Sequence, residues 1–117
     1  RNQFMAPTQV LLLRIYKGSK YQFKKHISEN YTSEAFDDNG YLVLRFYINH
    51  KGEVFLHDTI ELNHAYEAFD LNDSLVNQLT ALSFRKGNWN PFGDNKNNYY
   101  MHLTYRIENG KITEIIP

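Results

Sequence analysis

The sequence predicts one α+β domain in which a three- to four-stranded antiparallel sheet packs against two helices. Two observations predict this fold. Large apolar side chains occupy every second position over residues 42–48 and 99–107, a period that is typical of strands buried on one face. Elsewhere apolar side chains recur about four residues apart, as they do on one face of an amphipathic helix. The length of 117 residues fits a single hydrophobic core.

The predicted domain covers residues 18–117, and residues 1–17 precede it. Residues 1–7 show no periodicity and indicate an N-terminal tail. Residues 8–16 are rich in Val, Leu and Ile, which favours an extra strand in front of the domain. No repeat, low-complexity segment or second domain boundary interrupts the rest of the sequence.

A short amphipathic helix is predicted over residues 20–30. Ser19 and Gln22 match a capping box, in which the two side chains bind free backbone amides at the start of a helix. The face expected to be buried carries side chains at four-residue spacing, namely Phe23, Ile27 and Tyr31. The cluster Asp37-Asp38-Asn39-Gly40 then indicates a turn.

A β-hairpin follows the first helix. Its first strand should bury alternate side chains, Leu42, Leu44, Phe46 and Ile48. The turn at residues 49–52 ends in Gly52, which supplies the positive φ that such turns usually need. Residues 54–60 form the predicted return strand.

A loop and a second helix come next. We expect residues 61–70 to form a loop whose aromatic side chains, Tyr66 and Phe69, anchor it to the domain. The helix is predicted from leucines near helical spacing, with Asp70 or Asp73 as its N-cap: Leu71, Leu75, Leu79 and Leu82.

The last part of the chain predicts a second hairpin. Gly87 should follow the end of the helix, and residues 88–98 are polar enough to be a loop. Residues 99–107 alternate as a strand buried on one face. Asn109-Gly110 is the strongest two-residue hairpin signal, and residues 111–116 would be the return strand.

Charge and composition exclude several function classes. Thirteen basic residues balance thirteen acidic ones, so no net field attracts nucleic acid. The five His lack the spacing of a metal site, and no metal or other cofactor is expected. The close carboxylate pairs lie at turns and helix starts, where capping explains them better than catalysis. We therefore expect a protein that is not an enzyme.

The aromatic content leaves a small-ligand site open. Tyr41 and Tyr47 are predicted on the same outer face of the first hairpin strand, where they could lie together as a platform for a small molecule or a glycan. The competing interpretation is that each packs against a neighbour on the adjacent strand.

The order of these elements resembles the C-terminal domain of TonB, the periplasmic energy transducer of Gram-negative bacteria. Residues 23–31 resemble the first helix of that family, and residues 40–54 resemble its Gly, alternating strand, Arg-Phe-x-Ile and polar-Gly turn. Residues 71–82 resemble its second helix, Trp89-Asn90-Pro91 its Trp-x-Pro, and residues 99–107 its last core strand.

Two differences from the family pattern affect the interpretation. Thr32 stands where the family usually has Pro after the first helix. The chain also continues past the last core strand into the Asn109-Gly110 hairpin, whereas the family usually ends there.

The resemblance implies a periplasmic domain that binds a segment of a TonB-dependent outer-membrane receptor by β-augmentation and transmits energy for transport. An inner-membrane anchor would lie outside this segment. The edge implied for receptor binding is residues 99–107, with candidate contacts Tyr99, Tyr100, His102, Thr104 and Arg106.

The predicted return strand 111–116 conflicts with that edge. It could peel away when a partner binds, it could become the new edge, or receptor coupling could be lost. The alternative function is a secreted or periplasmic TonB-like module with a structural or dimerising role, as a homodimer, or with a small-ligand or glycan-binding role.

Overall fold

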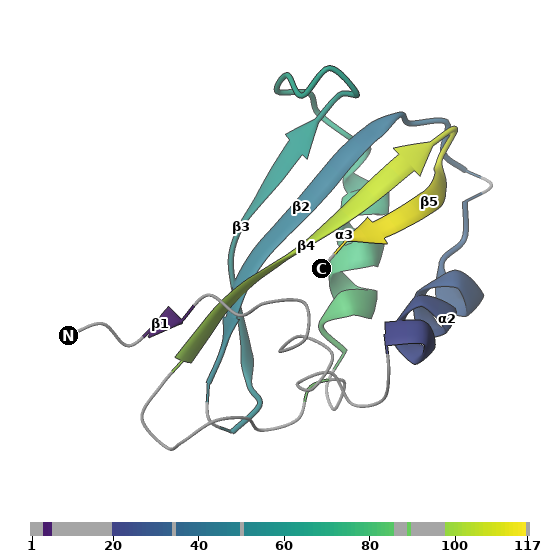
Figure 1. The fold of residues 1–117 in the computed structure, drawn as a ribbon. Helices are drawn as coiled ribbons and strands as arrows, with labels where there is room; N and C mark the ends of the chain where they lie inside the picture. Colours follow the sequence, from purple (N-terminus) through teal and green to yellow (C-terminus); the bar gives the residue numbers. More distant parts are fainter. Residues whose placement is uncertain are drawn as a thin grey trace.

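The computed structural model describes residues 4–5, 20–33, 35–49, 51–85, 89 and 98–116. Within these residues the chain forms an open sheet and two helices, the predicted α+β class (Figure 1). The elements follow one another as β1 Phe4–Met5, α2 Lys20–Asn30, β2 Gly40–Ile48, β3 Val54–Leu62, α3 Asp73–Ser83, β4 Asn98–Glu108 and β5 Lys111–Ile116.

Strand β2 lies at the centre of the sheet, between β3 and β4, and pairs antiparallel with both. Strand β5 pairs antiparallel with the other edge of β4, so the predicted antiparallel sheet is confirmed. The two residues of β1 run parallel to the start of β4 on that same edge. The predicted tail therefore contributes an extra strand, whereas the strand predicted over residues 8–16 lies outside the described residues.

One face of the sheet is buried because both helices pack on it. The inner side chains of β2 and β4 join those of α2 and α3 in one apolar cluster. The β2 contribution is the predicted alternate set, fully buried: Leu42, Leu44, Phe46 and Ile48. From the helices come the predicted Phe23, Ile27, Leu75, Leu79 and Leu82, with Tyr31 half-buried at the border. The periodicities that predicted these elements are confirmed, except that Leu71, predicted on the second helix, is buried but lies before α3 begins at Asp73.

A small polar network lies inside this core and joins α3 to β4. The Ser83 hydroxyl donates to the Leu79 carbonyl at 2.7 Å and also contacts the hydroxyl of the fully buried Tyr105. The Trp89 Nε1–H donates to the Ser83 carbonyl at 3.0 Å. These contacts give partners to polar groups that water cannot reach, and they fix the end of α3 against the sheet.

The connection between β3 and α3 differs from its prediction. Residues 61–62 belong to β3, and neither predicted anchor is buried, since Tyr66 is 69% and Phe69 44% exposed. The N-cap of α3 is Asn72, whose side chain accepts from the Ser74 amide at 2.8 Å, in place of either predicted Asp. All three residues are good N-caps by type, so composition alone does not choose between them.

Several predictions fall outside the described residues, namely the capping role of Ser19 and the position of Gly87 after the second helix. Of the loop predicted over residues 88–98, the structure describes Trp89 and Asn98. Across the part of the chain that the structure describes, no helix has both the length and the apolar character that crossing a membrane requires.

Replacing Tyr105 by Phe should lower the free energy of unfolding by about 1–2 kcal/mol, because the Ser83 hydroxyl loses a buried hydrogen-bond partner. Urea denaturation followed by circular dichroism measures this. Tyr21→Phe is the matched control, since Tyr21 is exposed and the change should stay within about 0.5 kcal/mol. Equal losses in the two variants would contradict the proposed role of the network.

Candidate functional site

The residues predicted to contact a partner lie along β4 but do not share one environment. Tyr99 is buried with the core face of the sheet. The side chains of Tyr100, His102, Thr104 and Arg106 alternate with buried neighbours and lie on the face opposite the helices. His102 is exposed and the other three are half-buried. The β4 candidates on the outer face are therefore aligned in one row.

Strand β5 covers part of the edge of β4 that the resemblance implied for receptor binding. Its residues pair with β4 from Thr104 to Glu108, with one irregularity after Arg106. The predicted Asn109-Gly110 hairpin is thus confirmed, and both turn residues have positive φ, 52° and 76°. Backbone groups of this part of β4 are engaged on both sides.

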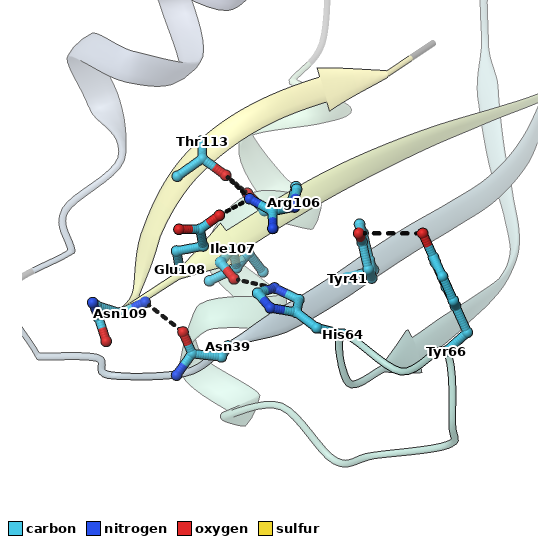
Figure 2. Close-up of polar contacts among 9 residues, drawn as sticks. All are labelled: Asn39, Tyr41, His64, Tyr66, Arg106, Ile107, Glu108, Asn109 and Thr113. Carbon is cyan, nitrogen blue, oxygen red and sulfur yellow. Dashed lines mark hydrogen bonds and ion pairs between the residues drawn. The ribbon is translucent and has the colours of Figure 1, made fainter.

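The turn between β4 and β5 is fixed to the segment that follows α2. The Gly110 amide donates to the Asp38 carbonyl at 2.8 Å, and the Tyr31 hydroxyl donates to the Gly110 carbonyl at 2.6 Å. The Asn109 amide donates to Asn39 Oδ1 at 3.0 Å (Figure 2). A Cβ atom on Gly110 would lie 2.2 Å from the Phe36 carbonyl oxygen, so only glycine fits.

A groove runs between the outer side of β5 and helix α2. We call it the β5 groove; its cavity volume is about 170 Å³, and it is lined by Lys24, Ile27, Ser28, Ile112, Thr113, Glu114 and Ile115. Ile27 and Ile115 are buried and give it an apolar floor. Lys24 on the helix and Glu114 on the strand supply charges of opposite sign at its rim. The groove therefore combines a strand edge with an apolar surface.

The opposite border of the sheet, β3, is protected in other ways. After β3 the chain turns back, and the Phe69 amide donates to the Glu61 carbonyl at 3.1 Å. Nearer its middle, the register with β2 shifts at Arg45, and Arg45 forms a two-point ion pair with Asp58. This hydrogen-bonded pairing lowers the pKa of Asp58. A bulge and a charge are the usual means of discouraging edge pairing.

The two tyrosines predicted to form one platform lie at opposite ends of the outer sheet face. Tyr47 stacks on Phe55 with ring centroids 5.5 Å apart. Tyr41 stacks on Tyr66 at 5.1 Å and 13° and meets His64 edge-on at 5.3 Å. The prediction that Tyr41 and Tyr47 lie together is wrong, and each packs on a neighbour instead.

Tyr41, His64 and Tyr66 form what we call the Tyr66 cluster (Figure 2). The two tyrosine hydroxyls lie 3.4 Å apart, and His64 Nε2 lies 3.0 Å from the Ile107 carbonyl oxygen. The hydrogen bond from Tyr66 and the nearby Arg106 guanidinium lower the pKa of Tyr41, while the same bond raises the pKa of Tyr66.

The loop that carries Tyr66 has the same hydrogen bonds as the turn between β2 and β3. In the β2–β3 turn the Asn49 side-chain oxygen accepts from the amides of Lys51 and Glu53. In the loop the Asn63 side-chain oxygen accepts in the same way from the amides of Ala65 and Glu67. The Asn amide donates to the carbonyl four residues on, and the amide three residues on donates back to the Asn carbonyl. The Asn side chain also donates to the Glu carboxylate.

The position that Gly52 fills in the first turn is filled by Tyr66 in the second. Both residues have positive φ, 81° for Gly52 and 64° for Tyr66. For a residue with a Cβ atom this conformation costs about 1–2 kcal/mol. The pattern Asn-His-x-x-Glu occurs at both residues 49–53 and residues 63–67, and this repeat is the sequence signal for the equivalence of the two turns.

Among residues 20–33, 35–49, 51–85, 89 and 98–116, no three His, Asp or Glu side chains come together as a metal site would require. His26, His57, His64 and His102 lie on different elements. His50 lies outside the described residues.

The anchored β4–β5 turn should weaken at high pH. Burial, with a contribution from Asp38, raises the pKa of Tyr31 to about 12. The unfolded pKa is about 10, so the stabilisation is complete below about pH 10 and is lost as the pH rises through the folded value. Urea denaturation across this pH range should show that the free energy of unfolding falls more steeply for the wild type than for Tyr31→Phe. Equal pH dependence in the two proteins would contradict this role of Tyr31.

Strain at Tyr66 should be measurable by comparing three variants. Tyr66→Gly should be more stable than Tyr66→Ala by about 1 kcal/mol, because both lack the ring but only Ala keeps the penalty. Gly52→Ala, the matched change in the equivalent turn, should lose about 1–2 kcal/mol. Urea denaturation gives all three values. Tyr66→Ala as stable as Tyr66→Gly would show that the loop carries no strain.

Comparisons with protein-family models, with curated proteins and with solved structures give no match to this chain.

Proposed function

We propose that this chain is a protein-contact domain that binds an extended segment of a partner by β-augmentation, as the TonB C-terminal domain does. The observation that carries the proposal is the β5 groove, in which the outer edge of a short strand borders an apolar surface on a helix. This combination provides backbone partners and side-chain contacts in one place.

The edge of β5 can supply the backbone hydrogen bonds. In an antiparallel pair only alternate residues bond to the neighbouring strand, and the amides and carbonyls between them point the other way. Strand β5 uses one set on β4. The second set points towards the groove side, where an added strand would continue the ladder.

Helix α2 can supply the side-chain specificity. Peptides that add a strand are selected by pockets for their alternate side chains. In the β5 groove, the half-buried Ile112 and the edge of Ile115 would contact an apolar side chain of the partner, with the fully buried Ile27 of α2 beneath them. Lys24 would favour an acidic residue of the partner, and Glu114 a basic one, next to that apolar side chain.

The anchored turn favours β5 as the new edge over its peeling away from β4. Release of β5 would break the hydrogen bonds of Gly110 with Asp38 and Tyr31 and would expose the buried Ile115. Each buried hydrogen bond contributes about 1 kcal/mol, and a buried Ile about 2 kcal/mol. A partner peptide would have to replace all of these contacts.

The finer assignment follows from the sequence motifs. The order helix, hairpin, helix and strand accords with the TonB-like motifs in residues 23–31, 40–54 and 99–107. By that resemblance the domain works in the periplasm, its partner is a segment of a TonB-dependent outer-membrane receptor, and a pulling force passes through the added strand. An inner-membrane anchor would lie outside this segment.

Peptides from the periplasmic segments of such receptors test the proposal by NMR titration. Amide shifts should move along residues 111–116 and 24–28, and a scrambled peptide should leave them unchanged. Ser28→Trp should weaken binding at least about tenfold by filling the groove. Glu29→Trp is the matched control, because Glu29 is exposed on the same helix but does not line the groove.

Three results would contradict the proposal: no shift with any receptor peptide, shifts confined to β3, or equal affinity of the two Trp variants. Shifts along residues 104–108 with loss of the β4–β5 pairing would instead show that β5 peels away.

A further inference from the structure

Tyr66 is an aromatic residue held where the fold would accept glycine more readily. The equivalent turn, with the same set of hydrogen bonds, uses Gly52 at that position. Burial does not compensate for the unfavourable backbone, because Tyr66 is 69% exposed. The stack on Tyr41 uses one face of the ring and leaves much of the side chain in contact with water. The exposed ring therefore needs a reason beyond folding.

The surroundings of the ring are polar and arranged in a line across the sheet. Tyr41 lies opposite Arg106 on β4, and Arg106 lies opposite Glu114 on β5. The hydroxyl of Tyr66 lies 3.4 Å from that of Tyr41, so the row begins at the loop; Figure 2 shows its residues Tyr66, Tyr41 and Arg106, and the strand register extends it to Glu114 on β5. It presents hydroxyl, guanidinium and carboxylate groups beside a flat aromatic face.

We propose that this row is a binding site for a neutral oligosaccharide, with one sugar ring stacked on Tyr66. Sugar rings have an apolar face that fits an aromatic ring, and their hydroxyls can donate to Glu114 and accept from Arg106 or the tyrosines. The row shares Glu114 with the rim of the β5 groove, but its aromatic face is Tyr66, which does not line the groove, and the site does not depend on the proposed β-augmentation.

The charges of the row favour a neutral ligand. Arg106 forms an ion pair with Glu108 and a 3.4 Å hydrogen bond with Thr113, so its charge is already balanced. Glu114 beside it would repel an anion. Tyr41 and Tyr66 stack nearly parallel at 5.1 Å and leave no space between them, so a cation could lie only over one exposed ring face, where the cation–π attraction is weak.

Calorimetric titration with three probes tests the proposal: chitohexaose as the neutral oligosaccharide, hexagalacturonate as the anionic one, and fully deacetylated chitohexaose as the cationic one. Chitohexaose should bind, with NMR shifts at Tyr41, His64 and Tyr66. Tyr66→Gly should weaken this binding at least about tenfold, because it removes the stacking face while keeping a residue that the turn accepts. Tyr66→Phe should lose less, since it keeps the ring.

Phe55→Ala is the matched control, because it removes an exposed aromatic ring from the far end of the same sheet face and should leave chitohexaose binding unchanged. Absence of chitohexaose binding, tighter binding of either charged probe, or equal affinity of Tyr66→Gly and the wild type would each overturn the inference. Circular dichroism of Tyr66→Gly confirms that a loss of binding is not a loss of fold.

Discussion

The structure depends on the burial of a single face of β2 and β4 beneath two helices. Alternate side chains of both strands enter the same apolar cluster as α2 and α3, and Tyr105 adds a hydrogen bond to Ser83 within it. A sheet that is buried on one side only must present its other face and its two borders to the surroundings. Those three surfaces are where contact with other molecules has to be sought.

The two borders are treated differently. At β3 a bulge, the Arg45–Asp58 ion pair and the returning chain each make strand addition unfavourable. At β5 the edge is short and is bordered by the apolar floor of a groove. Among the described residues no second strand pairs with β5, and an unpaired edge risks aggregation, so we interpret this edge beside the groove as a binding border.

Sequence periodicity predicted the elements but not how distant segments meet. The alternation of Leu42 to Ile48 and the spacing of Phe23 and Ile27 report which face each element buries, and they predicted the core correctly. Tyr41 and Tyr47 share a face too, yet six residues of strand place them about 20 Å apart. Alternation predicts which way two side chains point, but it does not predict how far apart they lie along the strand.

The β4–β5 turn and the Tyr66 loop show what local rules miss. Asn109-Gly110 predicts a hairpin, but its attachment to Asp38 and Tyr31 joins residues about 70 to 80 positions apart in the sequence and so needs the folded chain. Tyr66 has a positive φ, a backbone conformation that residues with a bulky side chain rarely adopt. A prediction from residue preferences would instead place this aromatic residue in the interior. Such a violation is most informative at the surface, because burial of the ring does not compensate for it: Tyr66 is 69% exposed, and its stack on Tyr41 covers one face only. The β5 groove and the row from Tyr66 to Glu114 have Glu114 in common, whereas Ser28 lines only the groove and Tyr66 belongs only to the row, so substitutions at these two residues test the two proposals separately.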